Sequence, residues 1–327
     1  MKALLCKQFG PPETLVVETL PDLVAGDTQV VIDVHAASVN FPDTLIVQGL
    51  YQFKPQLPFS PGGECAGVVN SVGSKVKTVK PGDKVIAFTG WGAFAEQVAA
   101  DPLQVMPMPA GMDFDTASAF VMTYATSYHA LKDRAALKAG ETLLVLGASG
   151  GVGLAAIEIG KALGAKVIAA ASSAEKLDVC RQHGADEVIN YTSEDLKDRI
   201  KTLTNGKGAN VIYDPVGGPY SEPALRSIAW RGRFLVIGFA NGEIPKIPLN
   251  LALLKGASIV GVFWGDYAKR EPMNNIMDLR ALFTWLTEGK LRPRIAGTYP
   301  LARGAEAIRA LMERKVSGKL VVHPRGD

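Results

Sequence analysis

The spacing of apolar residues changes abruptly within the stretch Leu143-Leu-Val-Leu-Gly-Ala-Ser-Gly-Gly-Val-Gly-Leu-Ala-Ala-Ile157. Residues 143–146 form a continuous apolar run of strand length, glycines interrupt the pattern, and residues 154–163 show apolar positions at helical spacing. A strand, a glycine turn and a helix in this order open a dinucleotide-binding βαβ unit. The turn departs from the strict glycine pattern, because Ala148 stands where the first glycine is expected.

Strand-like and helix-like segments continue to alternate after this unit. Residues 175–183 are predicted to form a helix, and the following segments are predicted to be buried strands: 166–171, 187–190, 210–214, 232–238 and 258–264. Alternating strands and helices favour a doubly wound parallel sheet, so the fold class is α/β with a Rossmann-type domain.

The first 120 residues have a different pattern. Short β-rich runs recur between clusters of glycine and proline, which is typical of a compact β domain. A helix is expected over residues 41–47, and a last strand over 319–323 is expected to return to this first domain. The predicted organisation is a catalytic domain at 1–122, a nucleotide-binding domain at 123–264 and a returning segment at 265–327.

The glycine turn and the end of the next strand supply the candidate cofactor contacts. A pyrophosphate is expected on the backbone N–H groups of Ser149, Gly150, Gly151 and Val152, where a helix begins. An NAD site places a carboxylate after the second strand, but this chain has Ser172 and Ser173 there, followed by Lys176. Hydroxyl and ammonium groups suit a 2′-phosphate, so NADPH is favoured over NADH. The alternative is that the serines cap a helix and Lys176 is solvated.

Composition narrows the classes of partner. The net charge of +3 comes without a basic block, which argues against nucleic acid, and no apolar run is long enough for a membrane span. The N-terminus lacks the pattern of a signal peptide. Three scattered cysteines (Cys6, Cys65 and Cys180) suggest reduced thiols, Cys65 as a small buried core residue, and a cytoplasmic location.

Several motifs along the whole chain resemble the zinc-independent quinone oxidoreductases of the medium-chain dehydrogenase/reductase superfamily. They are Val39-Asn-Phe-Pro-Asp43, Gln48-Gly-Leu-Tyr51, Pro61-Gly-Gly-Glu-Cys-Ala-Gly67, Val79-Lys-Pro-Gly-Asp83, Gly147-Ala-Ser-Gly-Gly-Val-Gly153 and Gly318-Lys-Leu-Val321. The resemblance implies a GroES-like catalytic domain completed by the C-terminal segment, a Rossmann domain between them, and a homodimer that joins Rossmann sheets edge to edge.

The same resemblance argues against a catalytic metal. Zinc-dependent relatives have a cysteine ligand where this chain has Asn40, and a histidine ligand where it has Gly63. A zinc site needs thiolate, imidazole or carboxylate ligands, so no metal is expected.

The resemblance also assigns individual residues. Tyr51 matches a tyrosine that donates to the substrate carbonyl or supplies a proton, Asn40 an asparagine near the nicotinamide ribose, and Thr126 a threonine beside the nicotinamide ring. The alternatives are a packing aromatic for Tyr51, a helix cap for Asn40 and a backbone-bonding residue for Thr126.

Three further residues lie close to predicted strands. Tyr191 resembles a residue along the adenosine, and Phe239 is expected on the nicotinamide side, although both could be packing aromatics. Lys319, before the last strand, is taken as a surface charge and left out of the predicted site.

Without a Lewis acid, the protein suits an electrophilic conjugated carbonyl better than a plain alcohol. The expected function is NADPH-dependent hydride transfer to a small-molecule quinone or enone, as in NADPH:quinone reductases and related enone reductases. An acryloyl-CoA or other enoyl-thioester reductase is the enzymatic alternative. A low-turnover NADPH-binding sensor or structural protein is the alternative from another class.

Overall fold

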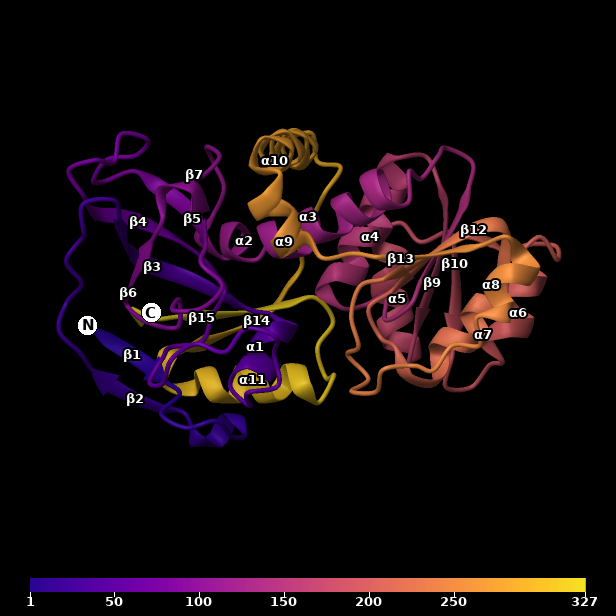
Figure 1. Ribbon diagram of the computed structural model, residues 1–327, viewed down its shortest axis with the longest axis horizontal. Coiled ribbons are helices and arrows are strands. Elements are labelled where there is room, and N and C mark those ends of the chain that lie inside the picture. Colours follow the sequence, from indigo (N-terminus) through magenta and orange to yellow (C-terminus); the bar gives the residue numbers. More distant parts are fainter. Residues whose placement is uncertain (327) are drawn as a thin grey trace. The chain divides into compact units, whose positions relative to one another are not determined.

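The computed structural model describes residues 1–326, which divide into two compact units. The first unit contains Met1–Met122 together with the chain from Arg294 onward, and the second contains Thr123–Pro293. Both ends of the chain therefore belong to the first unit (Figure 1). The chain passes from the first unit to the second and then returns to the first.

The first unit is mainly β-structure. Its strands are β1 (Lys2–Leu5), β2 (Val16–Thr19), β3 (Val30–Val39), β4 (Glu64–Val72), β5 (Lys84–Phe88), β6 (Gln97–Ala100), β7 (Val105–Pro107), β14 (Ile295–Pro300) and β15 (Lys319–His323). Its helices are α1 (Phe41–Ile46), α2 (Phe114–Ser118) and α11 (Gly304–Met312). Short 3-10 turns are η1 (Pro12–Thr14), η2 (Pro102–Gln104) and η5 (Leu301–Arg303).

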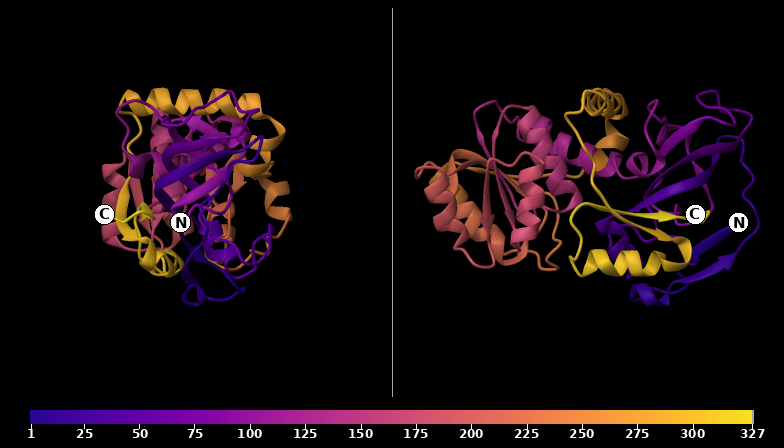
Figure 2. Two further views of the ribbon diagram at one scale, coloured as in Figure 1. Left: turned by 90° about the vertical axis from the view of Figure 1, so that its left-hand side faces the viewer. Right: turned by 180° about the vertical axis from the view of Figure 1, so that it is seen from behind.

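The C-terminal strands complete the main sheet of this unit. The strand order is β14-β15-β3-β4-β5-β7, and β6 also pairs with β3. Strand β15 runs antiparallel to β3 with Leu320 opposite Val39. In Figure 2 the yellow C-terminal strands and α11 lie among the indigo and purple elements of this unit. Because Val322 and Ile308 join the same apolar core as Ile32, residues from both ends of the chain stabilise it.

The second unit alternates strands and helices. Its strands are β8 (Thr142–Val145), β9 (Lys166–Ala171), β10 (Glu187–Asn190), β11 (Ala209–Asp214), β12 (Ile228–Val236) and β13 (Ser258–Gly261). Its helices are α3 (Val121–Tyr128), α4 (Gly151–Ala162), α5 (Ala174–Gln182), α6 (Leu196–Leu203), α7 (Ser221–Arg226), α8 (Asn250–Lys255), α9 (Trp264–Arg270) and α10 (Pro272–Thr287), with η3 (His129–Arg134) a π-helical turn and η4 (Gly218–Tyr220) a 3-10 turn.

The strands of the second unit form a parallel sheet in the order β10-β9-β8-β11-β12-β13. This is the strand order of a doubly wound nucleotide-binding fold. Strands β9 and β10 are added on one side of β8, and β11, β12 and β13 on the other side. Buried residues such as Leu144, Ile168 and Ile212 fill one face of the sheet. The predicted α/β class is confirmed, and the carboxyl ends of β8, β9 and β10 lie at one edge of the sheet.

The observed division differs from the expected boundary after residue 264. Helices α9 and α10 belong to the second unit, and the chain returns to the first unit from Arg294. Aromatic contacts explain this, because the ring of Trp285 in α10 meets the ring of Tyr128 in α3 edge-on at 5.5 Å. None of the helices in residues 1–326 has both the length and the apolar character needed to cross a membrane.

Candidate functional site

The loop between β8 and α4 brings the start of the helix close to the end of the strand. Gly147 has a φ of 56°, a left-handed conformation that favours glycine. A Cβ on Gly153 would stand 2.6 Å from the carbonyl oxygens of both Gly147 and Ala148, so only glycine lets the helix start this close to the strand. In contrast, a Cβ on Gly150 would come within 4 Å of a single atom, the carbonyl oxygen of Gly147.

This loop leads directly into the first turn of α4. Gly150 is the N-cap, Gly151 and Val152 are the first residues of the helix, and Ser149 is buried beside them. The first backbone N–H groups of a helix have no partner inside the helix, and they favour an anion. The predicted glycine-turn residues thus lie together where a phosphate group would fit.

The predicted phosphate-reading residues gather after β9. Ser173 is the N-cap of α5, and its hydroxyl accepts a hydrogen bond of 3.4 Å from the backbone N–H of Lys176. The ammonium of Lys176 donates a hydrogen bond of 3.0 Å to the hydroxyl of Ser172. The cap of α5 and the ammonium of Lys176 therefore lie together in this turn. Because β9 is the parallel neighbour of β8, these groups follow the same edge of the sheet as the glycine loop.

Two aromatic residues follow other strands of this sheet. Tyr191 comes directly after β10, and its ring lies 4.3 Å from the ring of Tyr220. Phe239 follows β12 and packs so closely against Gly217 that a Cβ there would lie 2.9 Å from the phenyl ring. Thr126 is half-buried in α3. The two aromatics therefore have packing partners at the carboxyl edge of the sheet, where a dinucleotide binds in folds of this kind.

Sequence reasoning missed Asp214, the last residue of β11. Its buried carboxylate accepts hydrogen bonds from the backbone of Val216 and Gly217, and from the hydroxyl of Ser221. Burial raises the pKa of this carboxyl. The bonds hold the turn against which Phe239 packs, and a lone acidic residue at the end of an apolar strand is the signal that could have identified it.

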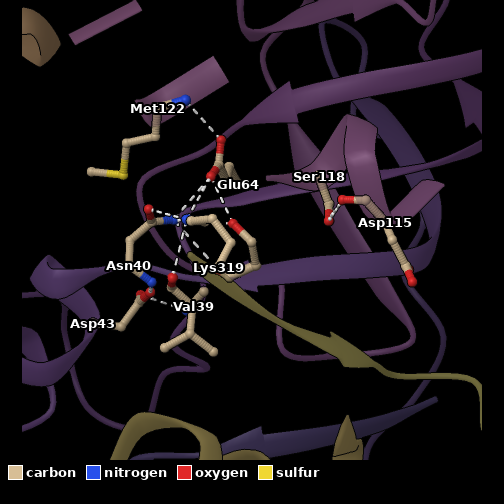
Figure 3. Close-up of polar contacts among 10 residues, drawn as sticks. Val39, Asn40, Asp43, Glu64, Asp115, Ser118, Met122 and Lys319 are labelled. Carbon is tan, nitrogen blue, oxygen red and sulfur yellow. Dashed lines mark hydrogen bonds and ion pairs between the residues drawn. The ribbon is translucent and has the colours of Figure 1, made fainter. Parts of the chain in front are cut away.

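In the first unit, Asn40 belongs to a buried cluster of polar side chains (Figure 3). Asn40 follows β3 and is the N-cap of α1, where its backbone N–H donates to the carboxylate of Asp43 at 2.7 Å. The amide Nδ2 of Asn40 donates to Glu64 at 3.1 Å, and its Oδ1 accepts from Lys319. The helix-cap role considered for Asn40 is real, but its side chain is also held by two charged residues.

Glu64 and Lys319 are the charged members of this cluster. Glu64 in β4 is fully buried, and its Oε1 accepts from Ser38, Asn40 and Lys319, while its Oε2 accepts from the backbone N–H of Met122. The interpretation of Lys319 as a surface charge is wrong, since this residue is 6% exposed. Its Nζ lies 3.2 Å from Glu64 in a buried ion pair.

Burial changes the acid–base behaviour of this cluster. Loss of solvation raises the pKa of Asp43 from 3.8 to about 6, against the opposing effect of hydrogen bonds from the backbone of Asn40 and Gly62. Burial also lowers the pKa of Lys319, although Glu64 opposes the change. The cluster thus contains a carboxyl group that titrates close to neutrality.

Tyr51 lies in the loop that follows α1. Its half-buried ring packs against the core of the unit and meets the ring of Phe53 edge-on at 5.9 Å. Burial raises the pKa of its phenol, and the charge of Asp43 adds to the effect. A phenol with a raised pKa stays protonated at neutral pH and can donate a hydrogen bond or a proton.

The two positions that carry zinc ligands in zinc-dependent relatives make other contacts in this chain. Asn40 is hydrogen-bonded to Lys319 and Glu64, and a Cβ on Gly63 would stand 3.2 Å from the backbone oxygen of Gly90. Within residues 1–326, no three or more His, Cys, Asp and Glu side chains are grouped to hold a metal ion. Cys65 is fully buried, as predicted, and burial raises the pKa of its thiol to about 12.

Comparison with protein families now defines the class. A model described as an alcohol dehydrogenase GroES-like domain matches residues 26–110, and one described as a zinc-binding dehydrogenase matches residues 151–281. With the observed parallel sheet, these matches place the chain among the medium-chain dehydrogenases/reductases, and the GroES-like and Rossmann domains inferred from the sequence are confirmed.

Individual relatives narrow the class further. Quinone oxidoreductase-like protein 2 homolog from Nematostella vectensis is 39% identical over 99% of this chain and 89% of its own length. The crystal structure of Escherichia coli quinone oxidoreductase complexed with NADPH has a TM-score of 0.94 at 30% identity, covering 99% of this chain and all of that one. The CurK enoyl reductase structure has a TM-score of 0.88 at 25% identity, covering 98% of each chain. The chain is an oxidoreductase of the quinone oxidoreductase family.

Proposed function

We propose that this protein is an NADPH-dependent reductase that transfers hydride to quinones or α,β-unsaturated carbonyl compounds. The observation that carries the proposal is the turn after β9, where Ser172, Ser173 and Lys176 replace the carboxylate of an NAD site. A hydroxyl–ammonium pair donates to a 2′-phosphate, whereas a carboxylate would repel it. The NADPH complex of the E. coli relative supports the same cofactor.

Different residues of the chain would bind different parts of the cofactor. Bound NADPH supplies a hydride to an electrophilic carbon. The glycine loop before α4 would hold the pyrophosphate, Lys176 the 2′-phosphate and Tyr191 the adenosine side. We assign Phe239, Thr126 and Asn40 to the nicotinamide end. These assignments rest on the resemblance and on the edge of the sheet at which the loop residues lie.

Tyr51 is the proposed catalytic residue toward the substrate. When hydride reaches the β-carbon of an enone, negative charge develops on the carbonyl oxygen and the α-carbon. A protonated phenol stabilises that oxygen by donating a hydrogen bond, and it can supply the proton that completes the reduction. A phenol is protonated at neutral pH, and burial, which raises the pKa of Tyr51, does not change this.

The test is a panel of acceptors with the purified protein. Benzoquinone, phenanthrenequinone, an alkenal, an enone and acryloyl-CoA are each mixed with NADPH, and the loss of NADPH absorbance is followed with and without EDTA. We expect NADPH-preferred turnover that EDTA does not change. Best activity on acryloyl-CoA would favour the enoyl-thioester alternative, which the likeness to CurK enoyl reductase supports. NADPH binding without turnover on any acceptor would contradict the proposal and favour a sensor or structural role.

We also propose that two copies associate through β13. This strand is at the edge of the sheet, and its Ile259 is 40% exposed. Trp230 and Leu253 are 69% and 80% exposed, and the Trp230 ring lies near Gly256, two residues before β13 begins. An exposed strand edge beside apolar side chains suits pairing with a second copy.

A further inference from the structure

Lys319 is a buried lysine, and burial of its ammonium group must be compensated. Removing an ammonium group from water costs several kcal/mol unless it is paired and hydrogen-bonded. An apolar residue at this position, the first of β15, would not have this desolvation cost. The compensation is supplied by acceptors from two other strands.

The acceptors match the donors of Lys319 one to one. An ammonium has three N–H donors and no acceptor. The Nζ of Lys319 is within hydrogen-bonding distance of the carbonyl oxygen of Val39 at 3.1 Å, the Oε1 of Glu64 at 3.2 Å, and the Oδ1 of Asn40. The antiparallel register that sets Leu320 opposite Val39 brings Lys319 to the level of Asn40.

This arrangement decides which way the amide of Asn40 faces. Because an ammonium cannot accept a hydrogen bond, the oxygen and not the nitrogen of the amide must face Lys319. The nitrogen then faces Glu64, whose carboxylate can only accept. The backbone of Asn40 is fixed separately by the carboxylate of Asp43. Cation and anion together thus select one of the two amide orientations.

We propose that Lys319 is a positioning residue that acts through Asn40. It holds the Asn40 amide in the orientation needed for cofactor binding and hydride transfer, and all three donors of its ammonium are directed to protein acceptors. The inference rests on the proposed function for its kinetic consequence, because Asn40 is assigned there to the nicotinamide end. The orientation of the amide itself follows from the hydrogen bonds alone.

The test is a double-mutant cycle with Lys319→Met, Asn40→Ala and the combined variant. We measure the NADPH dissociation constant by calorimetry, kcat with an enone, and the unfolding temperature. Lys319→Met should lower kcat/KM by roughly ten- to a hundredfold, the range expected when a reacting group is misplaced. The double variant should be no worse than Asn40→Ala, because Lys319 has no effect once Asn40 is gone. Multiplying losses would overturn the inference.

Two further variants separate positioning from stability. Leu320→Ala removes buried apolar surface next to Lys319 without touching the polar cluster, so it should lower the unfolding temperature and leave kcat/KM close to wild type. Equal kinetic losses in Leu320→Ala and Lys319→Met would overturn the inference. If Lys319→Met alone does not fold, Lys319→Met combined with Glu64→Gln removes both buried charges, and it should fold and still lose activity.

A structural readout makes the outcome independent of the proposed function. A neutron or atomic-resolution crystal structure of the Lys319→Met protein, or of the combined Lys319→Met and Glu64→Gln protein, distinguishes amide oxygen from nitrogen and should show the Asn40 amide turned or displaced. An amide that keeps its place in that structure would overturn the inference whatever the ligand. Absence of NADPH binding to the wild-type protein would instead overturn the proposed function, with the orientation of Asn40 still tested by the crystal structure.

Discussion

The ammonium of Lys176 lies 3.0 Å from the hydroxyl of Ser172, four residues earlier in the chain. Helix α5 begins between them, and its cap hydroxyl belongs to Ser173. An ammonium, two hydroxyls and a helix N-terminus thus gather after β9. Together they form a turn that favours a dianionic group, and it also contains the carboxylate of Glu175, which is hydrogen-bonded to Ser173.

The first prediction concerns this turn. Lys176→Glu should weaken NADPH binding by at least roughly tenfold, equal to about 1.4 kcal/mol, and should leave NADH binding nearly unchanged, because only NADPH carries the 2′-phosphate. Calorimetric titration with each cofactor measures both. Lys166→Glu is the matched control. Lys166 is the first residue of the strand that Ser172 follows, so this substitution makes the same charge change at the opposite edge of the sheet. Equal losses for NADPH and NADH would contradict a role in reading the phosphate.

A second prediction concerns the glycine loop. Gly153→Ala should weaken NADPH binding and lower the free energy of unfolding by roughly 1–3 kcal/mol, because its Cβ would press against two backbone oxygens 2.6 Å away. Gly160→Ala is the comparison within the same helix, as its Cβ would meet the end of the Leu143 side chain instead. We expect the comparison variant to be less stable but to bind NADPH normally. Normal cofactor affinity in Gly153→Ala would count against the loop as the pyrophosphate site.

The hydroxyl of Tyr51 is the subject of the third prediction. Tyr51→Phe keeps the ring that packs against Phe53 and removes the proposed donor. With an enone, kcat should fall by about a hundredfold or more, the typical value for a general acid, while the NADPH dissociation constant stays unchanged. Tyr299→Phe removes a hydroxyl from another half-buried tyrosine of the same unit and should leave kcat unaltered. Unchanged turnover in Tyr51→Phe would leave Tyr51 as a packing residue.

The fourth prediction uses the buried carboxyl of Asp43. Its pKa rises from 3.8 to about 6 on folding, so the folded protein holds this proton more tightly than the unfolded chain. The resulting stabilisation is fully present below about pH 4 and is lost as the pH rises through about 6. Asp43→Asn cannot titrate. The stability advantage of wild type over this variant should therefore shrink between about pH 4 and 7 by on the order of 1–3 kcal/mol.

Chemical unfolding at a series of pH values measures this difference for Asp43. Asp101→Asn alters an exposed capping carboxylate of the same unit and serves as the control. An advantage for wild type that is constant across the pH range, or that grows as the pH rises, would show that Asp43 is not held in the protonated form by burial.

A fifth prediction concerns association of two copies. Ile259→Lys places a charge on the exposed edge strand β13 and should convert a dimer to a monomer in sedimentation velocity experiments. Leu103→Lys makes the same change at an exposed site of the first unit and should leave the dimer intact. A wild-type protein that sediments as a monomer at high concentration would contradict the proposed pairing.

The cofactor loop could be predicted from sequence because its signals are local. Gly150, Gly153 and Ser172 lie within one strand–helix–strand unit, and apolar spacing reveals each element of that unit. The capping box of Asn40 and Asp43 is similarly local, with an acceptor three residues after the cap. These features need no knowledge of the tertiary fold.

The role of Lys319 could not be predicted in this way. Its partners Asn40 and Glu64 lie 279 and 255 residues away, and a charged residue is ordinarily exposed. The register of β15 against β3 brings them together, and no sequence pattern shows which strand a terminal segment will pair with. The same holds for α9 and α10, whose place in the second unit depends on aromatic contacts such as that between Tyr128 and Trp285.

The division of the chain has a consequence for its biosynthesis. The second unit is one continuous segment, Thr123–Pro293, so all of its strands have been synthesised before the last part of the chain emerges. The main sheet of the first unit needs β14 and β15, and the ammonium that balances Glu64 arrives with β15. During synthesis, the Rossmann unit can therefore fold before the earlier-made catalytic unit has received β14 and β15, and the Glu64 carboxylate has no ammonium partner until β15 emerges.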